Sequence, residues 1–80
     1  MDTTAIEAAG LLGVLLGQTV SPEDNVSMES CTAWDSMKHI EIIMTFEEKF
    51  GVSFAPEDIP RLTSQALLTA KVEELLGDRA

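Results

Sequence analysis

The segment that most limits how this chain can fold is SMKHIEIIMTFEEKF, residues 36–50, which contains neither glycine nor proline. Apolar and acidic residues alternate along it at spacings that suit an α-helix. Gly51 follows as a stop signal, and Lys49 lies in the last turn, where positive charge complements the helix dipole. The segment therefore predicts a helix over residues 36–50.

A preceding helix is predicted over residues 4–16, where apolar residues recur at helical spacing and Gly17 stands at the expected end. Gly10 and Gly13 each weaken such a helix by about 0.8–1 kcal/mol relative to alanine, so packing must stabilise it. We expect the two glycines to admit a neighbouring helix closely. The residues that recur at this spacing are Ile6, Ala9, Leu12, Leu15 and Leu16.

Two helical elements are predicted in the last third of the chain. Residues 55–60 combine prolines with acids in the pattern of a short helix of one or two turns. Thr63 or Ser64 can cap a longer helix that runs to Leu76 and ends at Gly77. Its expected inward residues are Leu67, Leu68, Val72, Leu75 and Leu76.

Residues 18–35 are rich in Ser, Thr, Asp, Asn and Pro and show no sustained period, which predicts a long loop. Loops longer than about 12–15 residues in compact domains are usually functional or disordered. We expect Val20, Val26 and Met28 to pin this loop to the core. The predicted fold class is thus all-α: a single domain, residues 1–80, built as a small helical bundle of three main helices plus one short helix.

The size and charge of the chain disfavour some classes of function. An 80-residue chain buries only roughly 60% of the surface that its unfolded form exposes, so binding or carrying is favoured over catalysis in a deep cleft. The net charge is −9, and residues 1–37 contain six acids and no Lys or Arg. An acidic surface repels phosphate backbones, so we expect no nucleic-acid partner and favour proteins with basic patches.

Cysteine usage and hydropathy indicate the compartment. The single Cys31 excludes an internal disulfide, and no Cys/His spacing suits zinc, so no metal site is expected. A reducing, cytoplasmic location fits best. The chain does not start like a targeting segment, and the apolar stretch 5–17 is too short for a bilayer and contains Glu7, so no membrane association is expected.

The helix predicted over residues 36–50 carries two apolar stripes that diverge by about 125°. We assign one stripe to the core: Ile42, Ile43, Phe46 and Phe50. The other is expected to be at least partly exposed as a partner-binding surface, beside two acids: Met37, Ile40 and Met44, with Glu41 and Glu48. The alternative is a more enclosed helix. Glu41, Glu47 and Glu48 by themselves would be an ordinary solvated face.

Trp34-Asp35-Ser36-Met37, with the long loop before it and the acids and Phe50-Gly51 after it, resembles the acyl carrier protein family over nearly the whole chain. In that family an Asp-Ser-Leu motif opens the second helix, and its serine hydroxyl receives a 4′-phosphopantetheine arm from coenzyme A. The motif here reads Asp-Ser-Met. The resemblance implies covalent attachment of 4′-phosphopantetheine at Ser36, with Asp35 and Met37 completing the motif.

The resemblance also implies partners and a role. The implied partners are a phosphopantetheinyl transferase and the acyl-loading and acyl-processing enzymes of fatty-acid, polyketide or related biosynthesis. The implied role is that of a monomeric carrier that is not itself an enzyme. Thr32-Ala33-Trp34 replaces the Leu and Gly that commonly precede the Asp, while Lys38, His39 and Lys49 depart from the usual charges. These differences favour a free-standing carrier of a specialised pathway.

Other interpretations of the same residues remain open. Ser36 or Asp35 can be a simple N-cap worth about 1 kcal/mol. Ser36 and His39 lie three residues apart, but nothing supplies an orienting acid or an oxyanion hole, so we reject a hydrolase and expect a packed or partly exposed histidine. Trp34 is either an anchor on the bundle or part of the partner surface. A peptidyl carrier and a non-covalent helical adapter are the alternative functions.

Overall fold

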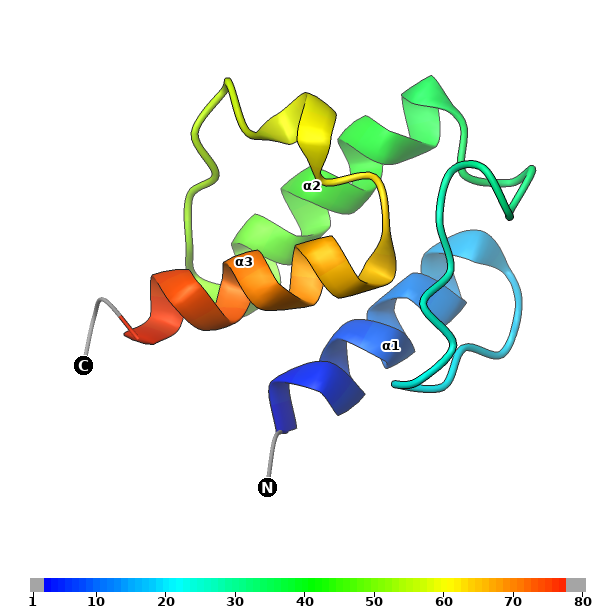
Figure 1. Ribbon diagram of the computed structural model, residues 1–80, viewed down its shortest axis with the longest axis horizontal. Helices are drawn as coiled ribbons and strands as arrows, with labels where there is room; N and C mark the ends of the chain where they lie inside the picture. The colour runs from blue at the N-terminus through cyan, green and yellow to red at the C-terminus, as the bar shows by residue number, and fades with distance from the viewer. Residues whose placement is uncertain (1–2, 78–80) are drawn as a thin grey trace.

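The computed structural model describes residues 3–77 of the chain, which form an all-α bundle (Figure 1). This confirms the predicted fold class. Three α-helices and one short 3-10 helix follow in the order α1 (Thr3–Leu16), α2 (Ser36–Phe50), η1 (Ile59–Arg61) and α3 (Gln65–Gly77).

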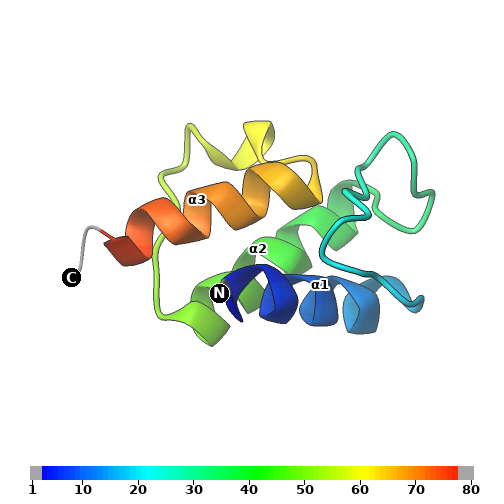
Figure 2. The same ribbon diagram turned by 60° about the horizontal axis from the view of Figure 1, so that its bottom comes forward.

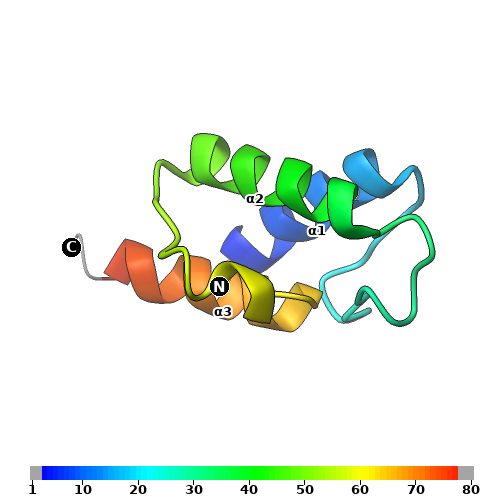
Figure 3. The ribbon, with the colours of Figure 1, turned by 90° about the horizontal axis from the view of Figure 1, so that it is seen from above.

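The three α-helices enclose one core, with α1 in contact with both α2 and α3 (Figures 2 and 3). The loop between α1 and α2 closes the end of the molecule that lies away from the end of α3 (Figure 1). The largest fully buried side chains come from the loop and from all three helices: Trp34, Phe46, Leu12, Ile42, Leu68, Gln65 and Val72.

α1 buries most of the apolar residues that recur at helical spacing. Ala9, Leu12 and Leu16 are buried, and Ala8 joins them. Ile6 shares the same spacing, but it is 55% exposed. Because α1 is apolar on most of its circumference, helical spacing alone does not determine which face packs against α2 and α3.

The expected role of the α1 glycines is also wrong. A Cβ at Gly13 would lie 2.7 Å from the backbone oxygen of Gln18, and a Cβ at Gly10 would meet nothing within 4 Å. Gln18 also donates its backbone N–H to the Gly13 carbonyl at 3.0 Å. Gly13 therefore makes room for the chain as it turns back after α1, and not for a neighbouring helix.

The long loop is fastened to the first turn of α3 by Gln65. Val26 donates its N–H to Gln65 Oε1 at 3.0 Å, and Gln65 donates its own N–H to the Val26 carbonyl at 2.7 Å. Gln65 Nε2 donates to the carbonyl of Ser21 at 2.8 Å. Val20, Val26 and Met28 pack against the core, which confirms the expected pinning of the loop.

α3 begins where it was predicted, but one inward residue was assigned wrongly. Ser64 Oγ accepts the N–H of Leu67 at 3.2 Å and so caps the helix. Leu68 and Val72 are buried, and Leu75 and Leu76 pack against the core. Leu67 is 49% exposed, because the turn that buries Leu68 places Leu67 beside the core and not within it.

The short helix lies slightly later than predicted. A turn closes with a 2.9 Å bond from the Asp58 N–H to the Ala55 carbonyl, and η1 follows at Ile59–Arg61. Lys71 Nζ on α3 pairs with Asp58 at 3.3 Å and joins η1 to α3. Hydrogen bonding to Asp58 raises the pKa of Lys71 above its usual 10.5.

Glu47 fixes the segment between α2 and η1. Its Oε2 accepts the backbone N–H of Phe54 at 2.8 Å, and both Val52 and Phe54 are buried. The N–H of Gly51, in the left-handed conformation with φ of 66°, bonds to the Glu47 carbonyl and ends α2 as predicted. Glu47 thus belongs to the internal hydrogen bonds of the bundle, unlike Glu41 and Glu48.

Candidate functional site

Asp35 is the N-cap of α2. Its backbone is extended, with φ of −99° and ψ of −173°, and its Oδ1 accepts the N–H of Lys38 at 2.8 Å. This satisfies one of the N–H groups that have no partner within the helix. Ser36 is therefore the first residue of α2, and the start of the helix is exposed at Asp35 and Ser36.

Ser36 is exposed, and its hydroxyl makes no hydrogen bond to any residue between 3 and 77. Of the two possible N-caps, Asp35 performs this role and Ser36 does not. The backbone N–H groups of Ser36 and Met37 belong to the first turn, at the positive end of the helix dipole. A hydroxyl in this position is accessible and lies close to donors that suit an anion.

Trp34 and His39 join the loop to α2. Trp34 is 1% exposed and its Nε1 donates to His39 Nδ1 at 3.0 Å. The two rings stack with centroids 6.0 Å apart. Of the two interpretations of Trp34, the anchor on the bundle is correct and the partner surface is wrong.

His39 is packed, as expected, and uses both ring nitrogens inside the bundle. An indole N–H can only donate, so His39 Nδ1 accepts. His39 Nε2 lies 2.8 Å from the carbonyl oxygen of Ile59, which can only accept, so Nε2 carries the proton. Neither nitrogen is directed at Ser36, which removes the geometric basis for a nucleophile and base pair.

The described residues also bear on metal and thiol chemistry. No group of three or more His, Cys, Asp or Glu side chains within residues 3–77 is arranged to hold a metal ion. Cys31 is buried and its Sγ lies 3.7 Å from Gln18 Oε1. The thiol therefore packs between the loop and the end of α1.

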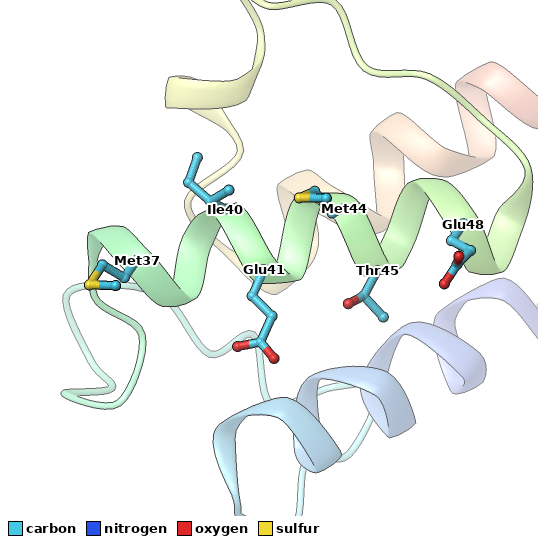
Figure 4. A pocket seen from close by; sticks show the side chains of 6 residues that line it. All are labelled: Met37, Ile40, Glu41, Met44, Thr45 and Glu48. Atoms are coloured by element: carbon cyan, nitrogen blue, oxygen red, sulfur yellow. The ribbon is translucent and has the colours of Figure 1, made fainter.

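The second stripe of α2 is exposed, as predicted. Met37 is 85% exposed, and Ile40 and Met44 are also exposed, while Ile42, Ile43 and Phe46 are buried. The alternative of a more enclosed helix is wrong. An open hollow of about 450 Å³ lies along this stripe, lined by Met37, Ile40, Glu41, Met44, Thr45 and Glu48 (Figure 4).

The two edges of the hollow differ in character. Ile40 and Met44 lie along one edge in Figure 4, and Glu41, Thr45 and Glu48 lie along the edge nearer α1. Thr45 was not singled out from the sequence, although its helical spacing from Glu41 and Glu48 places it on their side. Met37, which directly follows Ser36, lines the hollow at the start of α2, so this end of the hollow lies beside the candidate serine (Figure 4).

The charge of this surface is partly compensated. Lys38 Nζ lies 2.8 Å from Glu41 Oε1, one turn away on α2. Glu48 makes no ion pair with any residue that the structure describes. Lys38 thus offsets one of the two carboxylates, and Glu48 is the more available partner for a basic side chain.

The sequence matches no protein-family model and no curated protein. Within residues 3–77, no helix is long and apolar enough to cross a bilayer. The fold and the site together define a small all-α bundle with an exposed serine at the start of its second helix and an apolar, carboxylate-edged hollow beside it.

Proposed function

We propose that this protein is an acyl carrier protein, in which the Ser36 hydroxyl carries a 4′-phosphopantetheine arm that holds acyl groups as thioesters. The observation that carries the proposal is the exposed Ser36 hydroxyl, free of internal hydrogen bonds to the described residues, directly after the Asp35 N-cap. It is supported by the resemblance of the Asp35-Ser36-Met37 motif and of the surrounding chain to that family.

The chemistry of attachment assigns different roles to this chain and to its transferase. Ser36 Oγ forms a bond to the phosphorus of the pantetheine phosphate in coenzyme A, and the bond to the adenosine bisphosphate breaks. The proton of the hydroxyl goes to a base of the transferase, since both His39 ring nitrogens are engaged with Trp34 and Ile59. The attached phosphodiester then lies near the N–H groups of the first turn.

The partner surface of the proposed carrier is the hollow on α2. Exposed Met37, Ile40 and Met44 supply adaptable apolar contact, and Glu41 and Glu48 attract basic residues. Transferases and acyl-processing enzymes that present Lys or Arg around an apolar depression suit this surface. The carrier itself catalyses nothing and gives its partners a raised local concentration of the bound acyl group.

The composition of the chain supports a monomeric carrier in a reducing compartment. A net charge of −9 favours a monomer through mutual repulsion, and the single buried Cys31 suits a reducing cytoplasm. The acyl group belongs to fatty-acid, polyketide or related specialised biosynthesis.

Two other functions compete with this one. A peptidyl carrier would load an aminoacyl group through the same Ser36 chemistry, and a non-covalent adapter would use the α2 hollow without an arm. The unengaged Ser36 hydroxyl favours a carrier over an adapter. The acidity of the chain favours an acyl over a peptidyl carrier, since peptidyl carriers are less acidic.

Intact-mass measurement after incubation with coenzyme A and a phosphopantetheinyl transferase tests the proposal. The wild-type chain should gain the mass of one phosphopantetheine group, and Ser36→Ala should gain none while retaining native helix content. Modification of the Ser36→Ala variant, or mapping of the arm to Ser27 or Ser30, would refute Ser36 as the attachment site. An unmodified wild-type chain would favour the adapter.

A further inference from the structure

One end of the hollow on α2 lies beside Ser36, and one edge of the hollow is apolar (Figure 4). Met37, Ile40 and Met44 follow one another at spacings of three and four residues, so they share a face of the helix. All three side chains are exposed. A group attached to Ser36 therefore has exposed apolar side chains within its reach along α2.

We infer that this hollow holds the acyl group of the loaded carrier against Ile40 and Met44, and that it selects acyl chains with an uncharged end. The inference rests on the proposed function and adds the location of the acyl group to it. Met44 follows Ser36 by eight residues, which correspond to about 12 Å along the helix axis. An extended phosphopantetheine arm is longer than this distance and has many rotatable bonds, so the acyl chain can lie back over Met44.

Attachment to the same molecule makes a weak contact effective. A short flexible tether gives the acyl group an effective concentration at the hollow on the order of 1 mM. A contact with a dissociation constant of about 1 mM, too weak to retain a free ligand, is then occupied about half of the time. An exposed apolar edge on an open hollow of about 450 Å³ suits a contact of this strength.

The core beside Ser36 is filled by side chains of the bundle. Trp34 is buried and donates its indole N–H to His39. His39 Nε2 lies 2.8 Å from the carbonyl oxygen of Ile59 and so joins α2 to η1. An acyl chain that entered the bundle here would separate these partners and leave buried polar groups unpaired, which is unfavourable. The outer hollow accepts the chain without breaking these hydrogen bonds.

The carboxylates of the hollow determine which acyl chains it favours. Glu41 is paired with Lys38, whereas Glu48 makes no ion pair with any residue between 3 and 77. Glu48 follows Met44 by one helical turn, so its charge lies near the end of the apolar edge. A chain that ends in a methyl group can contact Met44, whereas a terminal carboxylate would be repelled by Glu48. The hollow thus favours an octanoyl group over the eight-carbon diacid group, suberyl.

The acyl group and the partner enzymes would use the same surface of α2. Partners of the proposed carrier contact Met37, Ile40 and Met44, and an acyl chain in the hollow covers these side chains. A partner that docks there therefore displaces the acyl chain, which becomes free to enter the active site of that partner. Between partners, the hollow shields part of the chain from water.

Nuclear Overhauser effects between the acyl chain and methionine methyl groups test the inference. The protein is labelled with ¹³C at its methionine methyl groups and loaded with acetyl, octanoyl or suberyl by a phosphopantetheinyl transferase that accepts acyl-coenzyme A. Met37 and Met44 line the hollow, and Met28 packs against the core. Octanoyl should show effects to Met37 and Met44 and none to Met28. Suberyl should show effects about fivefold weaker, the change that one pair of like charges in water implies.

Met44→Glu and Val14→Glu form a matched pair of variants. Met44→Glu places a charge on the apolar edge and should abolish the effects between octanoyl and Met37. Val14→Glu makes the same change at an exposed apolar residue of a second hollow, of about 320 Å³, between α1 and the start of the long loop. It should leave the effects to Met37 and Met44 unchanged. Circular dichroism verifies that both variants retain native helix content.

Several results would overturn the inference. Effects to Met28 would place the acyl chain in the core, and effects to none of these methionines would place it in solvent. Loss of the effects in Val14→Glu but not in Met44→Glu would assign the chain to the hollow beside α1. Equal effects from octanoyl and suberyl would refute selection by charge.

The same samples separate this inference from the proposed function. A wild-type protein that gains the mass of the loaded arm but shows no effects to Met37 or Met44 overturns the location of the acyl group and leaves the carrier function intact. A wild-type protein that gains no mass with coenzyme A or with any acyl-coenzyme A overturns the carrier function and, with it, this inference.

Discussion

Gln65 and Val26 exchange two hydrogen bonds across 39 residues of sequence: the Val26 N–H donates to Gln65 Oε1 and the Gln65 N–H donates to the Val26 carbonyl. Gln65 is 2% exposed, so a polar side chain fills a core position at the start of α3. This link determines where the middle of the long loop lies relative to the bundle, and thereby stabilises the segment that leads to Ser36.

Gln65→Leu should lower the free energy of unfolding by about 2 kcal/mol. The substitution preserves approximate volume but leaves the Val26 N–H and the Ser21 carbonyl without their partners, and an unpaired buried group costs about 1–3 kcal/mol. Urea denaturation followed by circular dichroism measures the change. Leu67→Ala, on the same helix but half-exposed, is the control and should cost less than about 1 kcal/mol. Equal losses in both variants would contradict the role given to Gln65.

Asp35→Ala should destabilise the fold by about 1 kcal/mol through loss of the N-cap on Lys38. Asp35→Asn retains a side-chain oxygen for this bond and should lose no more than a few tenths of that amount. Thermal unfolding of the two variants distinguishes capping from charge. If asparagine is as damaging as alanine, the carboxylate charge matters at this position and not its hydrogen bond.

Glu48→Lys should slow modification of Ser36 about fivefold at low ionic strength, because one contact pair in water contributes about 1 kcal/mol. Glu48 is preferable to Glu41 for this test, since reversal of Glu41 would also break its pair with Lys38. Glu57→Lys makes the same change of charge outside the hollow and should have a smaller effect. Rates are compared at about 20 mM and about 300 mM NaCl, because the screening of exposed charges by salt becomes strong over roughly this range. The partner surface is misassigned if both reversals behave alike.

Met44→Ala should weaken the complex with the transferase mainly by speeding dissociation. The exposed Met44 side chain gives short-range apolar contact and no charge, so it should leave the association rate nearly unchanged. Surface plasmon resonance separates the two rate constants. Val14→Ala, at an exposed apolar position on α1, serves as the control. A change confined to the association rate would contradict the contact role.

The melting temperature should rise with moderate NaCl or Mg²⁺. The chain has a net charge of −9, and the described ion pairs engage only Lys38 and Lys71 among its basic residues. Salt shortens the Debye length to about 8 Å at 0.15 M and weakens the repulsion among the remaining acids. Glu57→Lys removes two units of negative charge and should respond less to salt. A melting temperature that salt leaves unchanged or lowers would refute this prediction.

Several features of the structure could be predicted from residues that are close together in the sequence. The caps of α2 depend on neighbours a few residues apart, so spacing alone predicted the C-cap at Gly51 and limited the N-cap to Asp35 or Ser36. The exposed stripe of Met37 and Met44 could be predicted as well, because α2 alternates apolar and charged residues strongly enough to distinguish its faces. The same segment provided the candidate serine.

Tertiary structure decided what these local signals leave undetermined. α1 and α3 are apolar on several sides, so only their contacts with the other helices determined that Ile6 and Leu67 face solvent. The hydrogen bonds of Gln65 with Val26 and of His39 with Ile59 join residues that are distant in sequence. Periodicity and capping describe neighbours within about one helical turn, whereas these hydrogen bonds form only when the loop, α2, η1 and α3 are brought together by burial of a shared core.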